Sequence, residues 1–278
     1  MNIKAADVKA LREKTGAGMM DCKKALVACN GDEAEAVKFL KEKGLAAVSK
    51  RADKETLEGR IFVKNEGSRT VMLELTCETD FVANNKEFIA LGESICTEAL
   101  AKGYTEVNEN LEKMIEELQI KIRENMSVKR LVAIDVPTGS VLSSYVHSDA
   151  KTGVLVLIST DSASAAEDDT VKQFAYDCCL HIAAFMPAFI KEDDVDEKYI
   201  AEQKEIFMSQ VADMDKPDNV KQGIVKGKLK KHLASICFMD QPFVKDDKVS
   251  VAKKLEQIAK ETNAKLTLEK VVSFQLGQ

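Results

Sequence analysis

The sequence predicts an α+β protein that combines helical segments with short antiparallel sheets. Three observations predict this class: an opening stretch with only helical periodicity, two strand–strand–helix units in the middle, and two long amphipathic segments after them. The chain has 278 residues, which is enough for more than one folding unit. We divide it into an N-terminal helical part with its linker (1–54), a first core part (55–140) and a second core part (141–278).

Residues 1–52 are predicted to form three short helices. The first helix carries the apolar residues Val8 and Leu11 and ends at the glycine-containing turn 16–18. Asp32 is placed to cap the third helix, whose buried face we expect to consist of Ala36, Val37, Leu40 and Leu45. Three short helices bury little apolar surface, so we expect this part to be marginally stable on its own.

The middle of the chain repeats one pattern, a β-hairpin that leads into a helix. The predicted strands of the two hairpins are 60–64, 70–75, 141–147 and 153–158. The helices that follow them are predicted over about 86–102 and 170–185. Between the two units we expect a helix over 111–126 and a strand over 131–136 that joins the first sheet. The repetition predicts two related strand–strand–helix subdomains with antiparallel sheets.

Two amphipathic segments then predict an antiparallel helical hairpin, or short coiled coil, inserted at about 188–235. Its apolar positions recur at helical spacing and are Ile200, Phe207, Val211 and Met214, then Val225, Leu229, Leu233 and Ile236. Lysines crowd the second arm and form either a solvated face or a binding face. The chain closes with a module over about 248–278, with a helix at 249–262 and a strand at 266–276.

The composition excludes several classes of function. A net charge of −6 and a pI near 5.4 argue against nucleic acid as the main partner, because phosphate binding needs a concentrated positive field. No apolar run is long enough to span a membrane, and the N-terminus has no secretory h-region. Seven scattered cysteines without a CxxC pair indicate free thiols in a reducing compartment. We therefore expect a cytoplasmic protein that does not bind membranes.

The chain offers few groups for catalysis. Cys178 and His181 would share one helix face and could form half of a zinc site, but no second ligand pair follows and their neighbours are apolar. We expect a packed structural role for both. The turn at 16–18 lacks the Gly-Lys-Ser/Thr of a phosphate-binding loop and lies between two helices. We expect no catalytic residue, no metal ligand and no cofactor, and we do not expect the chain itself to bind a nucleotide.

One aromatic side chain stands in an unusual place. Residues 71–75 form a predicted strand, and Phe81 follows beside Asp80 where a strand-to-helix loop is expected. Phe81 either folds back onto the core or serves as a wedge for a partner protein. Met19 and Met20 pose the same question, because thioethers fill cores and also suit adaptable contact surfaces.

Two long motifs resemble those of the bacterial translation elongation factor Ts family. Residues 11–26 (LREKTGAGMMDCKKAL) are similar to the N-terminal motif of that family, and residues 78–83 (ETDFVA) to its second motif. Shorter similar segments, HIAA from His181 and QPFV from Gln241, follow in the right order. The chain departs from the family pattern at Thr76, Ser273 and Gln278, and its turn at 148–152 lacks the usual double glycine.

The resemblance implies a guanine-nucleotide exchange factor for the GTPase elongation factor Tu, and not an enzyme. It implies that the N-terminal helices form a bundle of the ubiquitin-associated (UBA-like) type that docks on the GTPase. It also implies that the residues we call the wedge disturb the magnesium and phosphate site of the partner: Thr79, Asp80, Phe81 and Val82. Met19, Met20 and His147 are implied as further contacts. The alternatives are a helical binding module for a different partner and a metal- or thiol-dependent enzyme that uses Cys178 and His181.

Overall fold

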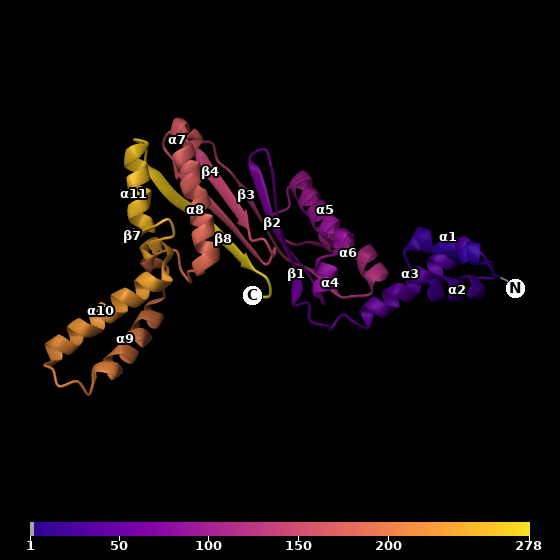
Figure 1. The fold of residues 1–278 in the computed structure, drawn as a ribbon, viewed down its shortest axis with the longest axis horizontal. Helices are drawn as coiled ribbons and strands as arrows, with labels where there is room; N and C mark the ends of the chain where they lie inside the picture. The colour runs from indigo at the N-terminus through magenta and orange to yellow at the C-terminus, as the bar shows by residue number, and fades with distance from the viewer. Residues whose placement is uncertain (1–2) are drawn as a thin grey trace. The chain divides into compact units, whose positions relative to one another are not determined.

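The computed structural model describes residues 3–278, with the side chains of Leu45 and Ala47 excepted. The chain forms two compact units (Figure 1). Unit 1 comprises residues 3–135, Ser148–Thr152 and Phe274–Gln278, and unit 2 comprises Val136–His147 and Gly153–Ser273. Both units combine helices with antiparallel strand pairs, which confirms the α+β class.

Unit 1 begins with the three predicted helices, α1 (Ala5–Thr15), α2 (Met19–Ala28) and α3 (Glu33–Ser49). Gly16 ends α1 in the left-handed conformation with φ 67°, which a side chain would disfavour. Asp32 caps α3 as predicted, because its carboxylate accepts from the Glu35 N–H at 2.9 Å. The small core of these helices consists of Val8, Leu11, Cys22, Ala25, Leu26, Ala36 and Leu40. Of the predicted buried face, Val37 is only partly buried, and the Leu45 side chain is outside the described residues.

An antiparallel sheet forms the centre of unit 1, in the order β1 (Glu58–Glu66), β2 (Arg69–Cys77) and β3 (Met126–Asp135). Two helices pack on it, α5 (Lys86–Lys102) and α6 (Glu109–Ile122). The inward side chains of β2 and both helices share one core that includes Leu73, Leu75, Phe88, Ile95 and Leu111. The first hairpin, its third strand and the helix at 86–102 are thus confirmed.

The predicted boundary between α6 and β3 is wrong. We expected the helix to continue to Met126, but Arg123 adopts φ 64° and ends it. Met126 instead opens β3, where it and Val128 are buried on the sheet face. Met126 and Val128 alternate with the polar Ser127, and β3 bulges directly after them, because Val128 pairs with Leu75 and Arg130 pairs with Glu74.

Unit 2 repeats the hairpin-and-helix pattern. Its strands are β4 (Ser140–Val146), β5 (Thr152–Thr160) and β8 (Leu266–Gln275), and its helices are α7 (Ala163–Glu167), α8 (Asp169–Phe185) and α11 (Val251–Glu261). The helix α8 lies against β4, and α11 packs on α8 (Figure 1). A two-stranded sheet of β6 (Pro242–Phe243) and β7 (Asp246–Ser250) was not predicted, and neither were α7 and two short 3-10 turns, Glu192–Asp194 and Phe238–Asp240.

The predicted helical hairpin is formed by α9 (Glu197–Val211) and α10 (Asp218–Ile236), which pack against each other in unit 2. Val211, Val225 and Leu233 are buried as expected. Met214 is instead 39% exposed, because α9 ends before it, at Val211. Among residues 3–278, no helix is long and apolar enough to cross a membrane.

Two glycines in helices are expected to respond to alanine in opposite ways. A Cβ on Gly92 of α5 would lie 2.3 Å from the buried Phe62 ring, whereas a Cβ on Gly227 of α10 would meet nothing within 4 Å. Gly92→Ala should destabilise the protein by about 1–3 kcal/mol through overpacking. Gly227→Ala should stabilise it by up to about 1 kcal/mol, because alanine favours the helix. Urea unfolding followed by circular dichroism measures both, and equal shifts of the same sign would contradict the packing at Gly92.

Candidate partner-binding site around Phe81

Phe81 does not fold back onto the core; its side chain is 85% exposed. The expected loop is instead a single helical turn, α4 (Asp80–Ala83), that follows β2 after Glu78 and Thr79. Val82 and Ala83 are buried in the core of unit 1, which turns Asp80 and Phe81 outward. Of the predicted wedge residues, Val82 therefore anchors the turn from inside, while Asp80 and Phe81 are available to a partner.

Thr79 is held at the start of α4 by a carboxylate from a distant part of the chain. Its hydroxyl donates to Glu124 Oε1 at 2.8 Å and its backbone N–H donates to Glu124 Oε2 at 3.2 Å. The Thr79 hydroxyl oxygen also accepts from the Val82 N–H at 3.4 Å, the capping contact of this turn. A four-residue helix is not stable by itself, so these contacts are what define the wedge.

Glu78, the residue before the wedge, is fixed just as firmly. Its carboxylate accepts from Arg51 Nε at 2.9 Å and from the Asn125 N–H at 2.6 Å. The hydrogen bond from Arg51 is the main cause that lowers the pKa of Glu78, and the Asn125 N–H adds to it. Glu78 therefore stays ionised and ties the linker, through Arg51, to the strand end that carries the wedge.

Asp80 is exposed, and its carboxylate makes no hydrogen bond or ion pair with the described residues. The charge of Asp80 acts on Lys151, whose ammonium group is bound to Glu58 at 2.7 Å. The hydrogen bond to Glu58 raises the pKa of Lys151, and the charges of Asp149 and Asp80 raise it further. Asp80 is thus a free anion beside an exposed aromatic ring.

Met19 and Met20 are exposed too, at 45% and 63%. They form the first turn of α2, which begins at Met19. Val27, which is 56% exposed, lies two helical turns after Met20 and so on the same side of α2. The three side chains make an apolar strip, which favours a contact surface over the local core.

His147 follows β4 in unit 2 and is exposed. Its ring meets Tyr145 edge-on with centroids 6.3 Å apart, and Tyr145 meets Tyr176 in the same way at 6.2 Å. His147 is thus one end of an aromatic group on the surface of unit 2. The wedge and the apolar strip of α2, in contrast, belong to unit 1.

Cys178 and His181 are packed side chains. The His181 Nδ1 atom accepts from the Val244 N–H at 3.2 Å, so the proton is on Nε2, which donates to Gln241 Oε1 at 2.8 Å. Burial lowers the pKa of His181 and raises the pKa of the Cys178 thiol, so both groups are neutral. The two imidazole nitrogens are already engaged. Within residues 3–278, no group of three or more His, Cys, Asp or Glu side chains is arranged to hold a metal ion.

Two departures from the family pattern have clear structural consequences. The Thr76 hydroxyl is buried and donates to Thr56 Oγ1 at 2.9 Å, and it lies 3.3 Å from the Ser127 carbonyl oxygen. It thereby connects the end of β2 to β3 and to the segment before β1. In the turn without the double glycine, Ala150 takes the left-handed conformation (φ 57°), and its carbonyl oxygen accepts from the Ile61 N–H at 2.7 Å.

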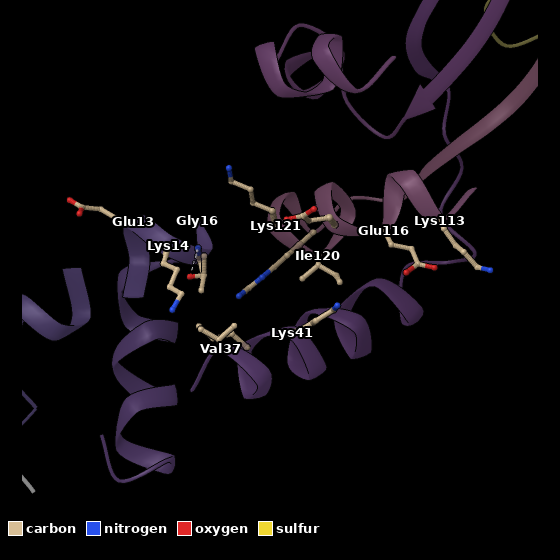
Figure 2. Close-up of a pocket in the computed structure, with 14 residues that line it drawn as sticks. Glu13, Lys14, Gly16, Val37, Lys41, Lys113, Glu116, Ile120 and Lys121 are labelled. Carbon is tan, nitrogen blue, oxygen red and sulfur yellow. Dashed lines mark hydrogen bonds between the residues drawn. The ribbon is translucent and has the colours of Figure 1, made fainter. Parts of the chain in front are cut away.

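A cavity of about 640 Å³ lies in unit 1 between the end of α1, α3 and α6 (Figure 2). Its lining is mostly charged, and four of its cations are paired: Lys14 with Glu33, Lys113 with Glu109, Lys121 with Glu87 and Arg123 with Asp21. Below it, α3 approaches α6 so closely that a Cβ on Gly44 would lie 2.3 Å from Ile120 Cγ2. The cavity lies where the N-terminal helices pack against α6, and we assign no ligand to it.

Comparison with known proteins identifies the family. The family model described as "Elongation factor TS" matches residues 78–278, well over half of the chain. Proteins named Elongation factor Ts from Treponema denticola and Treponema pallidum are 56% and 49% identical over the whole chain and 99% of their own lengths. The protein of that name from Borreliella burgdorferi is 40% identical over 99% of both chains. This chain therefore belongs to the elongation factor Ts family, whose members are nucleotide exchange factors for elongation factor Tu in translation.

Proposed function

We propose that this chain promotes GDP release from elongation factor Tu by inserting the wedge near the magnesium and phosphate site of the GTPase. The observation that carries this proposal is the 85% exposure of Phe81 on a turn whose Thr79 and Val82 are held in place. Exposing a Phe ring is costly, and burial against a partner recovers about 1.5–3 kcal/mol. Asp80 beside it brings a negative charge toward a site where Mg²⁺ bridges the phosphates.

The wedge directs the exchange but does not supply all the free energy. A release that is about 10⁴-fold faster needs a barrier lower by about 5.5 kcal/mol. One Phe ring provides about half of that at most. The remainder comes from other surfaces that bind the partner, for which the apolar strip of α2 (Met19, Met20, Val27) and the aromatic group at His147 are the candidates.

Several finer features belong to the same proposal. The three N-terminal helices act as a UBA-like docking bundle, the two hairpin-and-helix units form related subdomains, and α9 with α10 acts as a short coiled coil. The chain works in the cytoplasm as a protein-binding factor without a cofactor or chemical reaction of its own. It needs no direct contact with nucleotide, nucleic acid or membrane.

Docking through α2 has a direct test. The double variant Met19→Ala, Met20→Ala should raise the concentration of this chain that half-saturates GDP release from elongation factor Tu by about tenfold, as loss of about 1.4 kcal/mol of apolar contact predicts. Stopped-flow fluorescence of labelled GDP measures it. Met208→Ala, which removes a 39% exposed methionine from α9, is the matched control and should change little.

If the chain did not accelerate GDP release at all, the exchange-factor proposal would be wrong. A helical module for a different partner would then be the better account of the exposed strip on α2. An unchanged half-saturating concentration in the double variant, with release still accelerated, would reject only the docking role of the two methionines.

A further inference from the structure

Three consecutive residues, 123–125, make a notable set of contacts in unit 1. The Arg123 guanidinium pairs with Asp21 of α2 at 2.6 Å. Glu124 accepts both hydrogen bonds from Thr79 at the start of the wedge. The side-chain amide of Asn125 donates to the backbone carbonyl oxygens of two linker residues, Ala52 at 3.2 Å and Lys54 at 2.8 Å. One tripeptide therefore touches the N-terminal helices, the wedge and the linker.

The backbone conformation makes this arrangement possible. Arg123 adopts φ 64°, which turns the chain sharply at the end of α6, while its N–H still donates to the Gln119 carbonyl oxygen at 2.7 Å. Non-glycine residues rarely occupy this conformation, so the surrounding contacts must maintain it. Met126, the next residue, is buried in β3. The tripeptide is therefore held between two fixed elements.

The contact between Glu124 and Thr79 specifies the geometry of the wedge. A carboxylate that accepts from both the hydroxyl and the backbone N–H of one residue fixes the rotamer and the backbone of that residue together. Because α4 has only four residues, its direction follows from this capping residue and from the buried Val82. Loss of the Glu124 contact leaves Phe81 attached but free to sample other directions.

We infer that residues 123–125 are positioning residues that hold the wedge at a fixed orientation to the docking helices, so that docking free energy is transmitted to Phe81. The inference rests on the proposed function and extends it. If the turn were mobile, docking would still bring the wedge to the partner. The Phe81 ring would then insert near the magnesium and phosphate site in only a fraction of the complexes. Docking affinity would then be kept while the maximal rate of exchange falls.

The absence of tryptophan from the sequence provides a test that needs no partner. In a Phe81→Trp background the indole is the only fluorophore excited at long wavelength, and its time-resolved anisotropy reports the motion of the wedge. Adding Glu124→Gln or Thr79→Val should increase the amplitude of the fast depolarisation, and Thr79→Ser, which keeps the hydroxyl, should restore the slow one. Glu112→Gln removes an equal charge from an exposed position of α6, the helix that precedes the tripeptide, and is the matched control.

The second measurement is GDP release from elongation factor Tu with Phe81 intact. Glu124→Gln should lower the maximal rate by about tenfold, the factor that about 1.4 kcal/mol of lost positioning corresponds to. Its half-saturating concentration should stay within about twofold of that of Glu112→Gln, because the docking surfaces are unchanged. A structural defect would instead lower the thermal unfolding midpoint and weaken both parameters.

Each outcome decides the matter. Unchanged anisotropy in Glu124→Gln and Thr79→Val would overturn the positioning role, and so would increased motion with an unchanged maximal rate. If the unmodified chain does not accelerate GDP release from elongation factor Tu, the proposed function is wrong. The anisotropy experiment still shows in that case whether the tripeptide holds the wedge.

Discussion

Phe81→Ala is expected to lower the maximal rate of GDP release from elongation factor Tu by about 10- to 100-fold. Phe81 is 85% exposed in the free protein, so its truncation removes little from the core. The free energy lost is that of burying the ring in the partner, about 1.5–3 kcal/mol, which corresponds to a rate factor of this size. Stopped-flow release of labelled GDP at saturating concentrations of this chain measures the effect.

Two controls accompany this measurement, a matched variant and a test of stability. Phe185→Ala removes the same ring from a position in α8 that is 56% exposed, and we expect a much smaller change in the rate. Circular dichroism should show that Phe81→Ala unfolds at the same temperature as the unmodified protein. A rate that remained within about twofold of the unmodified rate would show that the ring is not inserted, because burial of a Phe cannot be worth so little.

Arg130→Ala is expected to destabilise unit 1 by about 3–5 kcal/mol, the cost of leaving a buried charge without its partner. Glu74 is fully buried in β2 and is paired with Arg130 across the sheet. Arg130 also donates to the Gln275 carbonyl oxygen at 2.8 Å and lies over the Phe274 ring at 4.3 Å. Its removal leaves the carboxylate without a positive partner, with the Gly277 N–H still donating to Glu74 Oε1 at 3.2 Å, and it takes away the Arg130 contacts of the C-terminal residues. Chemical denaturation followed by circular dichroism gives the change in free energy.

A double variant without either charge separates the cost of the unpaired carboxylate from the value of the pair. Glu74→Leu combined with Arg130→Met replaces both charges by apolar groups and should recover most of the stability that Arg130→Ala loses. Lys14→Ala breaks an exposed pair with Glu33 and should cost no more than about 1 kcal/mol. If Arg130→Ala cost no more than Lys14→Ala, the ion pair with Glu74 would not contribute the stability predicted for a buried pair.

The sequence was sufficient for elements whose ends carry their own chemical signals. The helix predicted over 86–102 has these bounds because Asn85 caps it through the Glu87 N–H and Gly103 ends it in the left-handed conformation. Apolar periodicity likewise located both hairpins and the α9–α10 pair. Local propensity and burial favour the same structure in these elements, so either one predicts them correctly.

Elements made by tertiary contacts could not be predicted in this way. The helical turn α4 depends on Glu124, which is 45 residues away from Thr79 in the chain. The end of α6 depends on Arg123 in a conformation that sequence rules reserve for glycine and asparagine. The two short strands β6 and β7 pair over so few residues that no alternation is visible.

In the candidate site, too, the residues within a sequence motif were predicted, and those that act through tertiary contacts were not. The family motif pointed to Phe81 and Asp80, but sequence alone left open whether the ring is buried. The supporting residues Glu124 and Asn125 were missed. Their signal was a run of three polar residues, 123–125, between the apolar residues Ile122 and Met126; such a run is typical of a turn, but we had placed it inside a helix.

The central claim is that this chain prefers the nucleotide-free form of elongation factor Tu and that Phe81 contributes to this preference. Linkage requires that GDP weaken the binding of this chain by the same factor by which the chain weakens the binding of GDP. Isothermal titration of the chain into the GTPase with and without GDP measures that factor directly. We predict a large preference for the nucleotide-free form that falls by about 10- to 100-fold in Phe81→Ala. Equal affinities for the two forms, or a preference that Phe81→Ala leaves unchanged, would contradict the claim.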